Sequence, residues 1–276
     1  MFFMEVADAA ITAAKIYEER KAIFSLFARK WDHIANGPSS IVIFGAGGTG
    51  KSTLGHLLAD NPQSSEYALE PYDESTNIET LPIPGKISAN VMIGPGQKIR
   101  RIATWDSLFN LLITQKKVLI INVVSWGYHA TSVELEKIIE NFPQKSDEQK
   151  RDEYFAMSRR HELEAFSDLV PHVKASQSIN RMLTIVTKQD LWWKHRKKVK
   201  DYYQKNEYNE MIEDIIRHKG AGNFVHEYIS CSLVCKNLFD SNNFTICLTT
   251  SGYDEPLRLT NFNKTLEKTK EFLNHE

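Results

Sequence analysis

Short continuous runs of apolar residues alternate with helical stripes along most of the chain. Runs rich in β-branched residues predict buried strands at residues 41–44, 118–124, 182–186 and 224–230, and a further short strand at 244–249. Stripes with a spacing of three or four residues predict helices between these runs. Strands that alternate with helices predict an α/β fold, a three-layer sandwich in which helices cover both faces of a mostly parallel sheet.

Two more strands are predicted at residues 77–83 and 87–93, with Pro84-Gly85-Lys86 between them. Proline and glycine between two apolar runs favour a hairpin, which adds one antiparallel strand to the sheet. Gly94-Pro95-Gly96 ends the second strand, and a helical pattern at residues 99–112 follows. The apolar positions of this pattern are Ile99, Ile102, Trp105, Leu108, Phe109 and Leu112.

Helical stripes account for most of the remaining chain. They are predicted at residues 1–37, 132–175, 191–219 and 260–273. The first is an amphipathic helix, which packs either on the core of the domain or on a protein partner. Residues 38–276 then form one domain. Within it, the stretch at 128–180 exceeds a usual crossover between two strands, so we interpret it as a helical insertion.

Composition narrows the class of protein. The 276 residues are 42% hydrophobic, which is enough for a full core. Lys and Arg total 34 against 35 Asp and Glu, so no global charge favours nucleic acid or an anionic membrane. Three cysteines late in the chain do not resemble a disulfide framework. With neither a signal peptide nor a run of about 18 apolar residues, we expect a cytoplasmic protein.

A glycine-rich sequence stands directly between the first strand and a helix. It reads Gly-Ala-Gly-Gly-Thr-Gly-Lys-Ser at residues 45–52, which is a phosphate-binding P-loop in its required context. Glycines let consecutive backbone N–H groups turn toward a triphosphate, and the helix N-terminus adds its positive end. Lys51 is expected to reach the β- and γ-phosphates, and Ser52 to bind Mg²⁺. The nucleotide-binding residues predicted here are Gly45, Gly47, Gly48, Thr49, Gly50, Lys51, Ser52 and Thr53.

The order of motifs resembles the Ras-like small GTPase superfamily across residues 40–232. The P-loop is similar to that of Ras itself. Gly94-Pro95-Gly96-Gln97 resembles the Asp-x-x-Gly-Gln element of the family, and Thr187-Lys188-Gln189-Asp190 resembles its base-reading Asn/Thr-Lys-x-Asp motif. Ser230-Cys231-Ser232 resembles its short Ser-Ala-x motif, for which Thr249-Thr250-Ser251 is an alternative. The resemblance implies a divergent Ras-like GTP-binding domain at 38–276.

The base-reading motif has a chemical reason. A carboxylate in the plane of guanine accepts hydrogen bonds from the N1–H group and the exocyclic amine together, and adenine offers no such pair. Asp190 is therefore expected to select GTP over ATP, with Lys188 lying along the base and the P-loop. Thr187 and the residues Ser230, Cys231 and Ser232 complete the predicted base site.

The resemblance also implies residues around the γ-phosphate. Thr76, or alternatively Thr80, matches the threonine that closes on Mg²⁺, so Ser52 and Thr76 are the predicted metal ligands. Gln97 matches the glutamine that orients the attacking water, and it is the predicted catalytic residue.

Ile93 stands where the family has an acid beside the magnesium ion. Isoleucine cannot hold a metal-bound water, which weakens the case for tight magnesium coupling and fast hydrolysis. An alternative places the acid at Asp106, provided that residues 98–104 form a strand. The alignment on Gln97 is preferred, because Arg100 and Arg101 suit a helix surface better than a buried strand.

Two charged segments have competing interpretations. Arg159 and Arg160, in the insertion, either act as arginine fingers or lie on a solvated helix. The basic run at residues 194–200 is either a solvated helix face or a site for nucleic acid or anionic lipid.

These features favour a GTP-binding switch that slowly hydrolyses GTP to GDP. It would relay its state to a protein partner through the N-terminal helix or the insertion. The alternatives are a non-hydrolysing nucleotide-binding module, which Ile93 favours, and a P-loop ATPase, which would need Asp106 as its acid.

Overall fold

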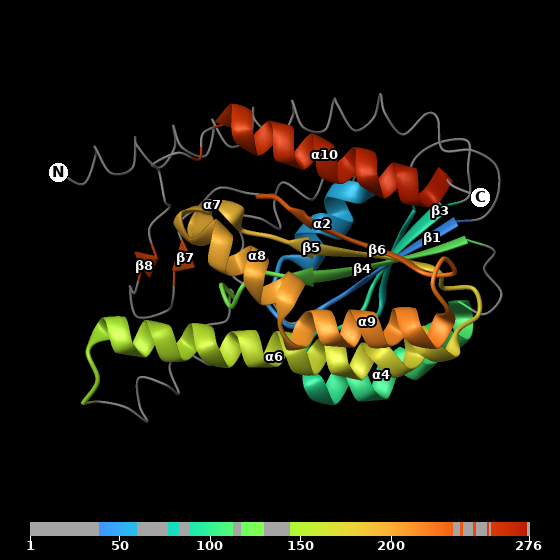
Figure 1. The fold of residues 1–276 in the computed structure, drawn as a ribbon, viewed down its shortest axis with the longest axis horizontal. Coiled ribbons are helices and arrows are strands. Elements are labelled where there is room, and N and C mark those ends of the chain that lie inside the picture. The colour runs from blue at the N-terminus through green and yellow to red at the C-terminus, as the bar shows by residue number, and fades with distance from the viewer. Residues whose placement is uncertain are drawn as a thin grey trace.

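Six strands form one sheet in the order β2-β3-β1-β4-β5-β6 (Figure 1). The computed structural model describes residues 39–59, 77–82, 89–112, 117–129, 144–233, 238–239, 245–246, 253 and 255–274. The strands are β1 (Ser39–Phe44), β2 (Glu79–Pro82), β3 (Ala89–Ile93), β4 (Lys117–Val124), β5 (Arg181–Val186) and β6 (Val225–Ser230). Two short strands, β7 (Leu238–Phe239) and β8 (Thr245–Ile246), pair separately.

All neighbouring strands of the large sheet pair in parallel except β2, which runs antiparallel to β3. In that pair, Glu79 lies opposite Ile93 and Pro82 lies opposite Asn90. The predicted α/β class, with a mostly parallel sheet and one antiparallel hairpin strand, is therefore confirmed. The central strands β1, β4 and β5 are the continuous apolar runs of the sequence, as expected for strands that are covered on both faces.

The helices occupy the predicted regions. They are α2 (Lys51–Leu58), α4 (Lys98–Leu112), α6 (Asp147–Ala175), α7 (Gln189–Trp192), the 3-10 helix η1 (Trp193–His195), α8 (Arg196–Lys205), α9 (Glu207–Lys219) and α10 (Glu255–Asn274). Helix α6 begins with a capping box, in which the Ser146 side chain accepts from the Gln149 backbone amide and the Gln149 side chain accepts from that of Ser146. Among the described residues, no helix is both long enough and apolar enough to cross a membrane.

Side chains on the two faces of the sheet form two separate cores. Along β1, Ile41 and Ile43 belong to the core that α2 and α10 cover, and Val42 and Phe44 to the core under α4, α6, α8 and α9. Figure 1 shows these two helical layers on opposite sides of the strands. Burying one such side chain contributes about 1.5–3 kcal/mol, so this alternation holds both layers in place.

Helix α4 differs in two details from what the sequence predicts for this region. Residues 98–104 lie in this helix, so the alternative that they form a strand is wrong. Trp105, Leu108 and Leu112 are buried as predicted, but Ile99 is 84% exposed. Ile99 lies in the first turn of α4 and faces solvent instead of the core.

Several predictions lie outside the described residues and stay predictions. They concern the helix at 1–37, Thr76, the turn at 84–86, and Thr249-Thr250-Ser251. Of the stretch interpreted as an insertion, residues 128–129 and 144–180 are described, and α6 fills most of the second part.

Candidate functional site

The P-loop joins β1 to α2 through glycines in conformations that other residues rarely adopt. Gly45 has a φ of 138°, and a Cβ atom there would lie 2.2 Å from the Val123 carbonyl oxygen. Gly50 precedes α2 with a φ of 96°, and no side chain at that position caps the helix. The first N–H groups of α2 are thus open to an anion, which the helix dipole favours at this end.

Two side chains hold the loop from within. The Lys51 ammonium donates a hydrogen bond to the Ala46 carbonyl at 2.7 Å, and the Thr49 hydroxyl donates to the same oxygen at 3.0 Å. Burial, helped by the positive charge of Arg101, lowers the pKa of Lys51 to about 7. The loop therefore contains an amine that an arriving phosphate would hold in its charged form.

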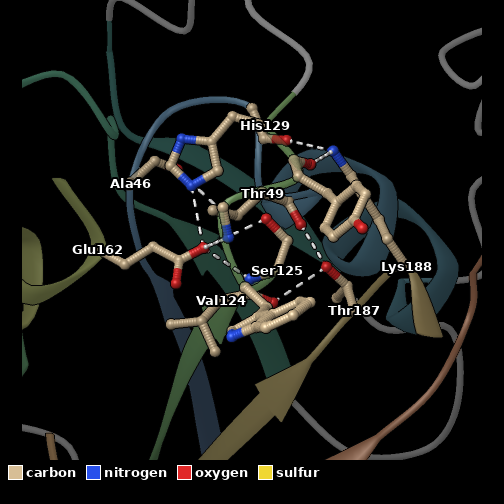
Figure 2. Close-up of polar contacts among 12 residues, drawn as sticks. Ala46, Thr49, Val124, Ser125, His129, Glu162, Thr187 and Lys188 are labelled. Atoms are coloured by element: carbon tan, nitrogen blue, oxygen red, sulfur yellow. Dashed lines mark hydrogen bonds and ion pairs between the residues drawn. The ribbon is translucent and has the colours of Figure 1, made fainter. Parts of the chain in front are cut away.

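The Thr187–Asp190 motif contacts the P-loop although they are far apart in sequence. The Thr187 hydroxyl donates to the Thr49 carbonyl at 2.6 Å, across 138 positions of the chain. The Lys188 ammonium donates to the Gly48 carbonyl at 2.7 Å and to the Tyr128 carbonyl at 2.5 Å (Figure 2). The structure thus brings the predicted phosphate-binding and base-reading residues into one site.

Asp190 is paired on one side only. Its backbone amide donates to the Ser232 hydroxyl at 2.9 Å, and that hydroxyl donates to Asp190 Oδ1. Asp190 Oδ2 is buried and has no hydrogen-bond partner among the described residues. Burial raises the pKa of Asp190 to about 6, although the hydrogen bond from Ser232 opposes the shift. A buried, unsatisfied carboxylate oxygen is costly unless a ligand supplies the missing donor.

The Ser230-Cys231-Ser232 motif lies against the base-reading motif. The Gln189 amide donates to the Cys231 carbonyl at 3.3 Å, and Ser232 bonds Asp190. Cys231 is buried, and burial raises the pKa of its thiol to about 12, so it is not a reactive group. Ser230 ends β6 opposite Val186.

Gly96 packs directly on the P-loop. A Cβ atom on Gly96 would lie 2.4 Å from Lys51 Nζ and 2.6 Å from the Gly47 nitrogen. Gln97 is the next residue, and its carbonyl accepts the Arg101 amide at 2.8 Å. The backbone at Gln97 therefore begins beside the P-loop, whereas the catalytic role of its side chain stays a prediction.

The position of the missing acid is apolar. Ile93 is 1% exposed, and a Cβ atom on Gly55 would lie 2.4 Å from its Cδ1. The alternative acid, Asp106, has a 78% exposed side chain on α4, where it faces His172 at 3.7 Å. Thr80, the alternative to Thr76, is exposed on β2.

A magnesium ion would find few protein ligands here. Ser52 lies in the first turn of α2, and within the described ranges no group of three or more His, Cys, Asp or Glu residues lies together to hold a metal. Magnesium often binds through phosphate oxygens and keeps several waters. The single hydroxyl of Ser52 is consistent with an ion of that kind.

The burial of two charged residues of this region was not predicted from the sequence. Arg101 lies on α4 as predicted, but its predicted place on the helix surface is wrong, because it is buried, donates to the Gly96 carbonyl at 2.6 Å and pairs with Asp168 at 2.8 Å. Glu162 is buried on α6 and pairs with His129 at 2.9 Å. Glu162 shares the helix stripe of Ala165 and other buried residues, and a charge on such a stripe was the available signal.

The other charged candidates lie at the surface. Arg159 is half-buried, 5.4 Å from the centre of the Trp126 ring, and Arg160 is exposed. In the basic run at 194–200, all residues except Val199 are exposed. Both interpretations of each segment stay predictions.

Neither a protein-family model nor a curated protein matches this chain. Among solved structures, it is similar to the small COPII coat GTPase SAR1 from Encephalitozoon cuniculi in complex with GDP. That match has 15% identity and a TM-score of 0.39, and covers 97% of this chain and 96% of the other. Translation elongation factor SelB from Methanococcus maripaludis matches with 12% identity and a TM-score of 0.36, over 88% of this chain and 35% of SelB.

Proposed function

We propose that this chain binds guanine nucleotides. The observation that carries the proposal is Asp190 Oδ2, a buried acceptor without a partner in the described structure, in a motif that touches the P-loop. Guanine presents two neighbouring donors, N1–H and the exocyclic amine, that would satisfy such a carboxylate. Adenine presents an acceptor at N1, which an ionised Asp190 would repel.

The phosphates lie along the P-loop in this proposal. Backbone amides of Gly47, Gly48 and Gly50 and the α2 N-terminus donate to them, and Lys51 supplies a positive charge. Ser52 and, outside the described residues, Thr76 would hold Mg²⁺, which neutralises phosphate charge when bound. The buried Arg101 adds a second cation next to Gly96.

We further propose slow hydrolysis of GTP to GDP. Gln97 would orient water for attack on the γ-phosphate, and its backbone position next to Gly96 supports this role. Ile93 leaves the site without the acid that the resemblance leads one to expect, so turnover is expected to be slow. Loss of the γ-phosphate would relax the neighbouring segments and signal to a protein partner, through the N-terminal segment or the stretch around α6.

A second candidate is a nucleotide-binding module that does not hydrolyse GTP. The buried, apolar side chain of Ile93 favours it, because isoleucine offers no oxygen ligand at this position. A P-loop ATPase is less well supported, since Asp106 faces solvent on α4.

Base selectivity is tested by competition between GTP and ATP for a fluorescent GDP analogue, together with identification of the nucleotide that copurifies. We expect GTP to bind at least about a hundredfold more tightly than ATP. ATP loses two hydrogen bonds to Asp190, and a loss of about 1.4 kcal/mol for each lowers affinity about tenfold. Asp190→Asn supplies a donor and should shift preference from GTP toward xanthosine triphosphate, which carries a carbonyl in place of the amine. Equal competition by ATP and GTP would refute the proposal.

Turnover is tested with a single equivalent of GTP. Formation of GDP that is lost in Gln97→Leu supports the switch. Tight binding without GDP formation supports the non-hydrolysing module instead.

A further inference from the structure

A single buried carboxylate organises the backbone that follows β4. Glu162 Oε1 accepts from the Ser125 amide at 2.8 Å, the Gly127 amide at 3.1 Å and the Ser125 hydroxyl at 3.3 Å. The same oxygen lies 2.9 Å from His129 Nε2. Oε2 accepts from the Tyr203 hydroxyl at 2.5 Å. Residues 125–129, here called the β4 exit segment, thus close around one side chain from α6 (Figure 2).

Glu162 is ionised in this setting. Its side chain is 0% exposed, and burial by itself raises the pKa of a carboxyl. The hydrogen bonds and charge of His129, with the donors on Tyr203 and Ser125, outweigh burial and lower the pKa of Glu162 below its usual value. Five donors on one buried carboxylate satisfy it well enough to offset its loss of water.

The β4 exit segment needs such an anchor because its own backbone is strained. Trp126 has a φ of 53°, a left-handed conformation that costs a non-glycine residue about 1–2 kcal/mol. Gly127 has a φ of 84°, and a Cβ atom there would lie 2.4 Å from the Phe155 carbonyl oxygen. Tyr203 completes the arrangement, because its hydroxyl accepts from the Trp126 amide at 2.8 Å while it donates to Glu162.

The same segment is linked to the P-loop by Lys188. The Tyr128 carbonyl accepts from Lys188 Nζ, which also donates to the Gly48 carbonyl in the P-loop. Figure 2 shows the Lys188 side chain reaching past Thr49 toward the segment that carries His129, with Glu162 on the far side of that segment. Glu162 is therefore linked to the P-loop by two successive contacts. Glu162 binds the β4 exit segment, and this segment binds Lys188, which contacts the P-loop.

We infer that Glu162 is a positioning residue for nucleotide binding, which fixes the β4 exit segment so that Tyr128 holds Lys188 against the P-loop. The inference rests on the proposed function where nucleotide is concerned. Its first step, the ordering of the P-loop by Glu162, concerns the free protein and is tested without nucleotide.

The test compares Glu162→Gln with Glu153→Gln, a matched change on the exposed side of α6, where Glu153 pairs with Lys145. Amide hydrogen exchange is followed over residues 45–52 and 125–129 in the full chain without nucleotide. The rate at which a fluorescent GDP analogue dissociates is measured separately. We expect Glu162→Gln to raise exchange in both segments and to speed dissociation about tenfold, as loss of about one charged hydrogen bond implies. Glu153→Gln should do neither.

The route through Lys188 is tested by a double variant. If Glu162 acts through Lys188, Glu162→Gln should change dissociation less than about twofold in a Lys188→Met background, because coupled residues are not additive. If Glu162→Gln does not fold, Tyr203→Phe, which removes one donor from Glu162, takes its place.

Three outcomes overturn the inference. They are exchange over residues 45–52 that stays as in the wild type whether or not the unfolding midpoint falls, exchange that rises equally in Glu153→Gln, and additive effects of the Glu162 and Lys188 changes on dissociation. If the wild-type protein binds no guanine nucleotide, the proposed function fails, and the exchange of the P-loop alone still decides whether Glu162 orders it.

Discussion

Ser232 and Asp190 exchange two hydrogen bonds, one from the Asp190 amide to the Ser232 hydroxyl and one from that hydroxyl back to Asp190 Oδ1. The pair fixes the carboxyl group in one orientation, with Oδ2 buried and unpaired among the described residues. A preorganised acceptor of this kind loses little entropy when a ligand donates to it, and it penalises a ligand that cannot.

The first prediction is that preference for GTP over ATP weakens in acid. The pKa of Asp190 in the free protein is raised from 3.8 to about 6, so its carboxyl is protonated below about pH 6 and ionised above it. Only the ionised form accepts both guanine donors. The ratio of GTP to ATP affinity should therefore be constant above about pH 7 and fall up to about tenfold per pH unit below about pH 6.

Competition titrations between about pH 5 and about pH 8 measure the ratio of GTP to ATP affinity. Ionisation of the phosphates does not change this ratio, because both nucleotides carry the same triphosphate. The Asp190→Asn variant serves as the control, since its ratio should not vary with pH. A wild-type ratio that is flat over the whole range would contradict the role given to Asp190.

The second prediction is that nucleotide binding takes up a proton. Burial and Arg101 lower the pKa of Lys51 to about 7, so above about pH 7 the amine is mostly neutral in the free protein. Phosphate oxygens favour the ammonium form and raise this pKa on binding. At about pH 8, close to one proton should be taken up per nucleotide bound, and affinity should fall as the pH rises further.

Calorimetric titration of GDP in two buffers that differ in ionisation enthalpy counts the protons. Lys51→Met should remove the uptake at about pH 8 along with most of the affinity. No uptake by the wild-type protein would mean that Lys51 is already charged before the phosphate arrives.

The sequence predicted the features that depend on local pattern. The apolar runs of β4 and β5 are continuous, which predicts strands that are buried on both faces. The closely spaced glycines between β1 and α2 predict a phosphate-binding turn. The relation of Asp190 to Ser232 could be anticipated only through the motif resemblance, because it joins two strands' ends across 42 positions.

The sequence could not predict the buried contacts of Arg101 and Glu162. The sequence favours a helix surface for Arg101, since charged residues usually lie there, but the Gly96 carbonyl and Asp168 together satisfy its hydrogen bonds inside the fold. Glu162 needs the Ser125 and Gly127 amides, and backbone donors leave no sign in the sequence. Ile99 shows the converse, an apolar residue of a helical stripe that is exposed to solvent.

The third prediction concerns Arg101, which we expect to stabilise the turn that precedes α4. Arg101→Met keeps the apolar stem but leaves the buried Gly96 carbonyl without the donor at 2.6 Å. An unsatisfied buried acceptor costs about 1–3 kcal/mol, so unfolding in denaturant should shift by that amount. Lys98→Met, on the same helix, removes an exposed ion pair with Glu164 at 3.6 Å and should change stability by less than about 0.5 kcal/mol.

Arg101→Met also tests the electrostatics of the P-loop. Loss of the guanidinium removes a charge that lowers the pKa of Lys51, so proton uptake at about pH 7 should decrease. Equal stability of the Arg101 and Lys98 variants would show that the Gly96 contact contributes nothing.

The last prediction concerns Gly55 and Ile93, which share one space between α2 and β3. Gly55→Ala would place a methyl group 2.4 Å from Ile93 Cδ1 and 2.8 Å from Cγ1. Overpacking of this kind costs about 1–3 kcal/mol, of which the better helix propensity of alanine offsets up to about 1 kcal/mol.

Ile93→Val alone removes Cδ1 and should cost about 0.5–1.5 kcal/mol. Because it also clears the space, the double variant should be more stable than the sum of the single changes implies, by about 0.5–3 kcal/mol. Denaturant unfolding of all four proteins measures this coupling. Strict additivity would show that the Ile93 side chain moves away from Gly55 without cost.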